Sequence, residues 1–130
     1  MDTFFVAKRF AVVGASLDRT KYGNKVLRWY LDHNLPVTPV NPKAEMIEGQ
    51  QCVRSLAELN DPGVSVSVIT PPQVSEQILK EAVRLGIKHI WFQPGSEPRG
   101  FKEVAAKHSG VIGNGPCVLV DGPSLLSAKL

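Results

Sequence analysis

Short apolar runs alternate along the chain with amphipathic stretches, and this alternation leaves few folds open. The first run, Phe10-Ala11-Val12-Val13, ends at Gly14. Because all four of its residues are apolar, the run is typical of a strand buried on both faces of a sheet. Residues 22–33 follow with apolar side chains at helical spacing, which predicts a helix packed on that sheet.

The same succession continues to the end of the chain. The second strand contains two prolines, which makes it short or places it near an edge. The third alternates Val and Ser, and this suits either a half-exposed strand or a buried strand whose small serines lie under a helix. We expect strands at 10–13, 36–40, 64–69, 87–92 and from 111, helices at 22–33, 55–59, 73–85 and 101–108, and a tail from Cys117 to a turn at Asp121-Gly122-Pro123.

Some helix ends carry recognisable signals. Gly86 stands where a left-handed C-terminal cap belongs. Ser55 and Glu58 have the spacing of a capping box for the short helix at 55–59.

Strands that alternate with helices predict a parallel sheet covered on both faces. Right-handed crossovers then give a doubly wound α/β fold with a mostly parallel, five-stranded sheet. We find no internal repeat, linker or low-complexity segment, so we expect residues 1–130 to form a single domain.

In such a sheet, ligands bind beyond the carboxyl ends of the strands, where the strand order reverses. The segments that follow the predicted strands should therefore lie close together. They are rich in glycine, proline and small polar residues, which leaves backbone groups accessible to a ligand. These segments are Gly14-Ala15-Ser16 with Lys21-Tyr22-Gly23, Asn41-Pro42-Lys43, Thr70-Pro71-Pro72, Gln93-Pro94-Gly95 with Ser96 and Glu97, and 114–117.

The first of these segments is typical of a phosphate-binding turn. Gly14 permits a tight turn and close approach of a ligand. The helix that follows directs free N–H groups and the positive end of its dipole to the same place. Only Gly14 and Gly23 are present, however, so the GxGxxG pattern is not met, and an ordinary strand-to-helix connection is the alternative.

The end of the second strand carries Lys43 and no carboxylate before Glu45. Folds that bind NAD commonly place Asp or Glu there to hold the ribose 2′-hydroxyl. A lysine suits a phosphorylated ribose, as in coenzyme A or NADP. A solvated loop lysine without a ligand is the alternative.

Composition excludes several other classes of function. The net charge of +3 is spread along the chain without a basic block, which argues against nucleic acid as the partner. Cys52 and Cys117 form no CxxC pair, so we expect no zinc site. No apolar run approaches the length of a membrane span, and the N-terminus has no signal-peptide pattern, so we expect a cytoplasmic protein.

Six segments together give the chain a family resemblance: FAVVGAS, KYGNKV, VTPVNPK, VSVSVITPP, LGIKHIWFQPG and GVIGNGPCVL. In this order they resemble the stand-alone CoA-binding proteins of the Rossmann type, and they are similar to the CoA-binding domain of the succinyl-CoA synthetase alpha subunit. The resemblance covers about residues 10–120.

The resemblance implies a binding site for coenzyme A or an acyl-CoA. Gly14, Ala15, Ser16, Lys21 and Tyr22 would surround the phosphates, and Lys43 would lie near the phosphorylated ribose. The segments 70–72 and 93–95 would surround the adenine and the pantetheine arm.

Catalysis by this chain alone is not expected. The synthetase carries its phosphorylated histidine in a second domain, and we expect His33, His89 and His108 to be structural or exposed. An NADP-dependent reductase or another small nucleotide-using enzyme is the alternative function, and a ligand-free interaction protein is a third. A protein partner is not identified, and a homo-oligomer stays open.

Three further side chains give separate expectations. Cys117 is a candidate reactive thiol that could form a mixed disulfide with CoA, although an isolated cysteine is more often a small buried apolar residue. Trp91 is expected in the core. Trp29 is expected to be partly exposed, where it could cover a partner surface.

Overall fold

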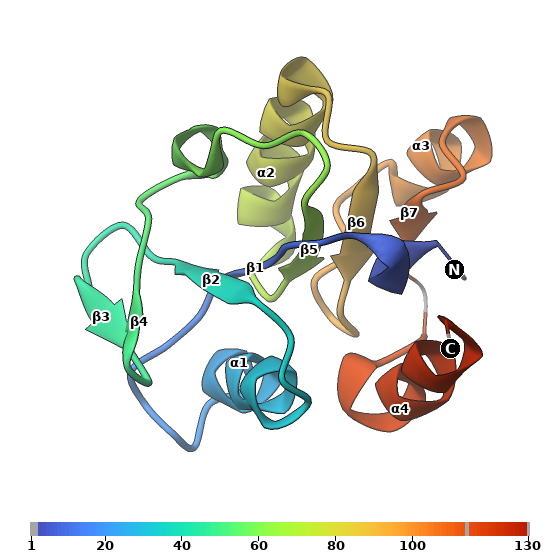
Figure 1. Cartoon of the computed structure of the whole chain (residues 1–130). Coiled ribbons are helices and arrows are strands. Elements are labelled where there is room, and N and C mark those ends of the chain that lie inside the picture. Colours follow the sequence, from blue (N-terminus) through green and yellow to red (C-terminus); the bar gives the residue numbers. More distant parts are fainter. Residues whose placement is uncertain (1–2, 114, 130) are drawn as a thin grey trace.

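The computed structural model describes residues 3–113 and 115–129. Its main sheet has five parallel strands in the spatial order β2-β1-β5-β6-β7. Helices cover both faces of this sheet (Figure 1), so the predicted doubly wound, Rossmann-like α/β fold is confirmed. The strands are β1 (Phe10–Val13), β2 (Val37–Val40), β5 (Ser65–Val68), β6 (His89–Phe92) and β7 (Val111–Ile112).

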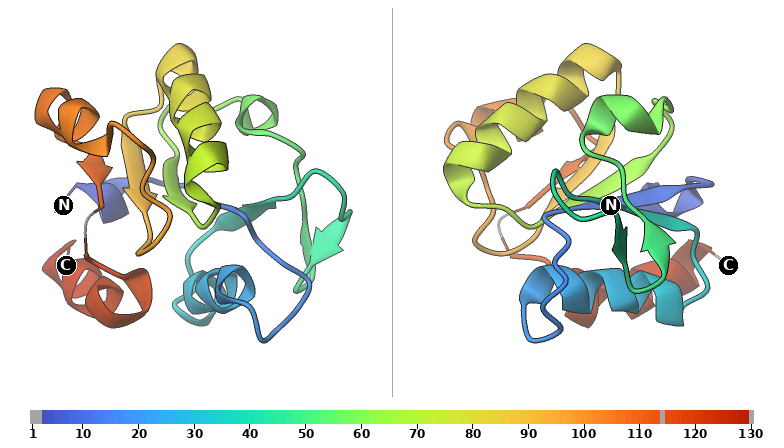
Figure 2. Two further views of the ribbon diagram at one scale, coloured as in Figure 1. Left: turned by 180° about the vertical axis from the view of Figure 1, so that it is seen from behind. Right: turned by 90° about the vertical axis from the view of Figure 1, so that its left-hand side faces the viewer.

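The two faces of the sheet have different cores. Helices α1 (Tyr22–Asp32) and α4 (Val118–Lys129) cover one face, and α2 (Pro72–Leu85) and α3 (Phe101–Lys107) cover the other (Figure 2). The first face is aromatic, with Phe4, Phe5, Phe10, Trp91 and Tyr30 in one buried cluster. The second is built mainly from aliphatic side chains of β1, β5 and α2.

Strand β5 shows why valine and serine alternate. All four of its residues are buried, so the half-exposed alternative is wrong. Val66 and Val68 pack on the aliphatic face. On the aromatic face, the Ser65 hydroxyl donates to the Phe4 carbonyl (2.6 Å), and the Ser67 hydroxyl lies 2.6 Å from the Tyr30 hydroxyl. The small serine side chains leave room for the aromatic rings, and their hydroxyls hydrogen-bond to the Phe4 carbonyl and the Tyr30 hydroxyl.

The C-terminal segment differs from the prediction. The turn expected at Asp121-Gly122-Pro123 is instead part of α4. Gly122 faces Trp29, and a Cβ at Gly122 would lie 2.6 Å from a ring carbon of Trp29. Here glycine permits close helix packing, and Pro123 is exposed. Trp29 is only 7% exposed, so its predicted surface position is wrong.

Local details differ in part from the prediction. A hairpin of β3 (Met46–Ile47) and β4 (Gln50–Gln51) occupies the expected loop after β2. A 3-10 helix at Phe4–Val6 precedes β1. A second 3-10 helix forms at Leu56–Leu59 without the predicted capping box, because the Ser55 side chain makes no cap bond and Glu58 accepts from the Arg54 N–H (2.7 Å) instead. The left-handed cap at Gly86 is confirmed (φ 76°).

Candidate functional site

The parallel register places the predicted ligand-binding segments at one edge of the sheet. Val13 pairs with Val40 on one side and with Val68 on the other, and Val68 pairs with Phe92. The residues that follow these strand ends therefore lie side by side. The chain moves from β1 to β2 at one side and then crosses to β5, so the strand order reverses between β1 and β5. In doubly wound sheets, this reversal marks the ligand crevice.

Two glycines allow the first loop, residues 14–21 between β1 and α1, to pack tightly against its neighbours. Gly14 has φ 91°, and a Cβ at Gly14 would lie 1.8 Å from the Ile69 carbonyl oxygen. A Cβ at Gly23 would lie 2.1 Å from the Gly14 carbonyl oxygen. The close approach that Gly14 and Gly23 permit is thus made by the protein's own backbone, between the start of α1, the first loop and the end of β5.

Two buried or half-buried amides hold the first loop in place. The Asn24 side chain, fully buried in the first turn of α1, donates to the Ser16 carbonyl (2.8 Å). The Asn41 side chain donates to the Ala15 carbonyl (3.0 Å), and its oxygen accepts from the N–H groups of Lys43 and Ala44. Asn41 therefore joins the first and second strand-end segments, as the sequence predicts for neighbours at one edge.

A polar network connects α1 with the start of α4. The Tyr22 hydroxyl lies 2.6 Å from Cys117 Sγ and 3.4 Å from Gln93 Oε1. Gln93 is fully buried, and its Oε1 accepts from the Val118 N–H (2.8 Å). Burial raises the pKa of Tyr22, with a further contribution from Cys117, so the phenol stays protonated at neutral pH. The Gln93 side chain faces the interior, and Pro94 and Gly95 form the exposed part of its segment.

The third segment is also tied to its neighbour. The Thr70 hydroxyl lies 2.7 Å from the Ser75 hydroxyl in the first turn of α2, and the Thr70 N–H donates to the buried Ser96 hydroxyl (3.2 Å). Of the residues predicted to bind the ligand, seven are exposed: Lys21, Pro42, Lys43, Pro71, Pro72, Pro94 and Gly95.

The two lysines that are predicted to bind the ligand belong to different strand-end segments. Lys21 precedes the first turn of α1. Lys43 lines a cavity of about 470 Å³ with Arg54 and Glu45, beside the β3–β4 hairpin. The exposed ammonium groups suit an anionic ligand. The predicted neighbourhood of Cys117 includes Asn114, which lies outside the described residues.

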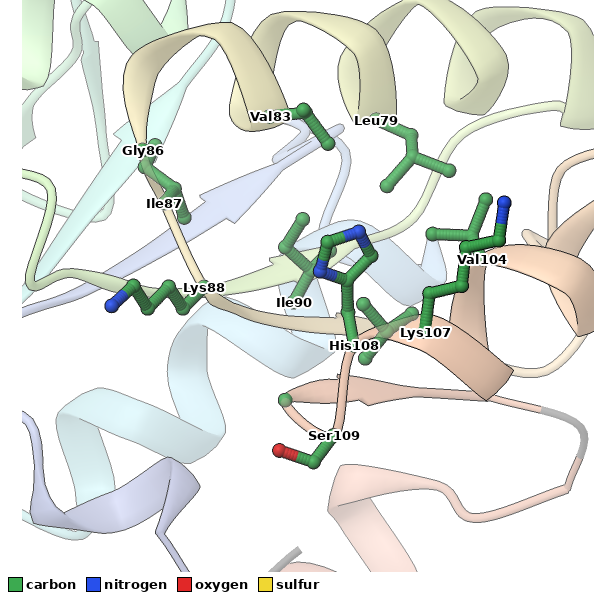
Figure 3. Close-up of a pocket in the computed structure, with 12 residues that line it drawn as sticks. Leu79, Val83, Gly86, Ile87, Lys88, Ile90, Val104, Lys107, His108 and Ser109 are labelled. Atoms are coloured by element: carbon green, nitrogen blue, oxygen red, sulfur yellow. The ribbon is translucent and has the colours of Figure 1, made fainter.

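A different cavity lies at the opposite edge of the sheet. It has a volume of about 350 Å³ between α2 and α3. Leu79 and Val83 form its wall on α2, while Lys107 and His108 approach it from the end of α3 (Figure 3). Because it is lined by the residues just before β6 and β7, this cavity is remote from the carboxyl ends of the strands.

The histidines occupy separate places. His33 ends α1 and stacks on Trp29 with ring centres 4.1 Å apart. His89 begins β6, and burial lowers its pKa, with a smaller contribution from Lys88. Within 3–113 and 115–129, no three His, Cys, Asp or Glu side chains gather as a metal ion requires. None of the helices in the same residues is long and apolar enough to cross a membrane.

Sequence reasoning missed the residues that support the first loop from outside. Glu48, at the tip of the β3–β4 hairpin, accepts from Asn24 and from Arg19. The only signal for this hairpin is the Glu48-Gly49 pair between short apolar and polar runs, and it is weak because each strand has two residues.

The strand order and the segments along the carboxyl edge define the chain as a Rossmann-like α/β protein. A family model described as a CoA binding domain matches residues 8–123. The chain therefore belongs to the CoA-binding domain family, and the resemblance predicted from the sequence is confirmed.

Three relatives show the range of this similarity. The chain is 30% identical over 81 residues to the ADP-forming acetate–CoA ligase of Methanocaldococcus jannaschii, an alignment that covers 62% of this chain and 12% of the ligase. It is 38% identical to a conserved hypothetical protein from Pyrococcus furiosus, with a TM-score of 0.79 and coverage of 88% of this chain and 98% of that one. A hypothetical protein from Pyrococcus horikoshii is 28% identical, with a TM-score of 0.83 and coverage of 96% and 88%.

Proposed function

We propose that the chain binds coenzyme A, free or acylated, at the carboxyl edge of its sheet. The observation that carries this proposal is the meeting of four strand-end segments around the β1–β5 reversal in a member of the CoA-binding domain family. The negatively charged phosphates of such a ligand would also complement the exposed lysines. The alternative of an NADP-dependent enzyme receives no support from the comparisons.

The roles proposed for the segments follow their chemistry. The first loop and the start of α1 supply backbone N–H groups, the helix dipole and Lys21 for the diphosphate. Lys43 would meet the 3′-phosphate of the ribose in this proposal. The segments 70–72 and 93–95 would surround the adenine and the pantetheine arm. Because the Gln93 side chain is engaged with Val118, its segment would contribute Pro94, Gly95 and backbone groups.

The proposed role is binding without catalysis by this chain alone. General acid–base or nucleophilic catalysis requires positioned groups that act together. The described edge supplies mainly glycine, proline and hydroxyl residues. We also propose that the 130 residues act as one domain in the cytoplasm, as a carrier or sensor of CoA.

Cys117 extends the proposal to thiol chemistry. Its thiolate would attack a sulfur of CoA disulfide, form a protein–CoA mixed disulfide and release one CoA thiolate. The exchange is balanced, because one disulfide is broken and one is formed. The contact with Tyr22, a residue of the proposed site, supports this location for the thiol.

Isothermal titration calorimetry with CoA, dephospho-CoA and NADP tests the proposed ligand. We expect saturable binding of CoA and weaker binding of dephospho-CoA, which lacks the 3′-phosphate. Equal affinities for CoA and NADP would indicate a general phosphate site and would contradict the assignment to CoA.

The Lys43→Ala variant tests the placement of the ribose phosphate. It should raise the Kd for CoA by about tenfold, as loss of one charge-assisted contact predicts. The Kd for dephospho-CoA should stay nearly unchanged. Lys102→Ala on α3 removes an equivalent exposed charge away from the site and is the control. Equal losses for both ligands would show that Lys43 does not contact the 3′-phosphate.

A further inference from the structure

The tip of the β3–β4 hairpin carries a carboxylate to the first loop. Glu48 (φ 49°) and Gly49 (φ 77°) form a two-residue turn with positive φ at both positions. Such turns reverse the chain tightly. The hairpin lies beside the segment that connects β1 with α1 (Figure 1), and Glu48 contacts Arg19 of that segment and Asn24 of α1.

The Glu48 carboxylate is held by both of its oxygens. Oε2 accepts from Asn24 Nδ2 (3.1 Å), the same nitrogen that donates to the Ser16 carbonyl (2.8 Å). Oε1 accepts from Arg19 Nη1 (2.6 Å). The Glu48 side chain is 18% exposed, whereas that of Arg19 is 62% exposed. The carboxylate thus lies within the loop, and the guanidinium reaches it from solvent.

The surroundings of Glu48 favour negative charge. Asn24 belongs to the first turn of α1, where the helix dipole attracts anions. The proposed function places the CoA diphosphate at the same loop and helix start. An anion of the protein is therefore already held next to the place proposed for an anion of the ligand.

Arg19 can exchange partners without disturbing the loop. Arg28 Nη2 donates to the Arg19 carbonyl (2.9 Å), and Arg28 Nε donates to the Asn24 side-chain oxygen (2.7 Å). These bonds hold the backbone of Arg19 independently of its guanidinium, which pairs with Glu48. An ion pair with one exposed partner contributes little to stability, and a guanidinium binds phosphate in a two-pronged geometry.

We propose that Glu48 sets the affinity of this site by competing with the phosphates of CoA for Arg19. In the unliganded protein Glu48 holds Arg19, and on binding Arg19 moves from the carboxylate to a phosphate oxygen. This inference rests on the proposed function and adds an internal competitor to it.

The test compares CoA titrations of the wild type and Glu48→Gln. Glutamine keeps an acceptor for Asn24 and removes the charge that holds Arg19. We expect the Kd for CoA to fall by about twofold to tenfold, within the range of partly exposed ion pairs and nearby charges. Glu103→Gln, which removes an exposed carboxylate on α3, should change the Kd less than twofold. Glu48→Asn, which suits the left-handed backbone, is a second variant in case the first folds poorly.

A second variant pair tests whether Arg19 is the shared partner. Arg19→Gln should weaken CoA binding, and the gain from Glu48→Gln should shrink in the Arg19→Gln background. If the wild type binds CoA and neither Glu48 variant binds it more tightly, the competition is refuted while the proposed function stands. If neither the wild type nor the variants bind CoA, both the proposed function and the inference fail.

Discussion

Replacement of Gln93 by leucine should destabilise the fold through one buried hydrogen bond. Gln93 Oε1 accepts from the Val118 N–H at 2.8 Å, whereas its contacts with Tyr22 (3.4 Å) and Ser67 (3.3 Å) are long. Leucine has a similar volume but cannot accept a hydrogen bond. The substitution therefore leaves the Val118 N–H buried without its acceptor.

The size of the loss in unfolding free energy depends on which buried groups lose their last hydrogen-bond partner. The Ser67 hydroxyl keeps the Tyr30 hydroxyl at 2.6 Å, and the Tyr22 hydroxyl keeps Cys117. Among the described partners of Gln93, the Val118 N–H alone is left without a hydrogen-bond partner, which costs about 1–3 kcal/mol. For a chain of 130 residues this corresponds to a fall in Tm of roughly 4–10 °C.

Urea denaturation followed by circular dichroism measures the free energy of unfolding directly. Gln77→Leu, the same change at an exposed position of α2, is the control and should stay within about 0.5 kcal/mol of the wild type. Hydrogen exchange should also show faster exchange in the first turn of α4. If Gln93→Leu lowers the free energy of unfolding no more than the control does, the role assigned to the Val118 hydrogen bond is refuted.

Three other substitutions or treatments have defined expected outcomes. Gly14→Ala should cost about 3 kcal/mol or more, because a Cβ would meet backbone, whereas Gly49→Ala, with open space around it, should cost about 1 kcal/mol; denaturant titration compares them. Burial lowers the pKa of His89 below its ordinary value of 6.5, so the unfolded chain binds more protons, and stability should fall as the pH drops below about 6.5. His89→Gln should flatten that pH dependence, and an unchanged slope would contradict it. Incubation with CoA disulfide should add one CoA mass at Cys117 rather than at Cys52, whose thiol pKa is raised by burial, and mass spectrometry without an adduct would refute the thiol proposal.

The main sheet could be predicted because its signals are local. The short apolar runs at 10–13 and 87–92 and the helical spacing of apolar residues at 73–85 are each visible within a short window, and parallel strands then bring their carboxyl ends to one edge. The segments that meet there follow from the topology without any side-chain detail.

The missed features depend on contacts between distant residues. Gly122 and Pro123 are typical turn residues, yet α4 continues through them, and glycine is needed at position 122 because a Cβ there would meet the Trp29 ring. Glu48 is close to the first loop only because a hairpin of two-residue strands folds back on it. Neither relation leaves a periodic signal in the sequence.

Nuclear magnetic resonance titration of the ¹⁵N-labelled protein with CoA tests the central proposal most directly. Binding of CoA at the carboxyl edge predicts that the largest amide shifts fall at the non-proline residues of 14–16, 21–23, 41–43, 70–72 and 93–95. Shifts concentrated instead at Val83, Lys88 and His108, around the cavity of Figure 3, would place the ligand at the wrong edge of the sheet and contradict the account.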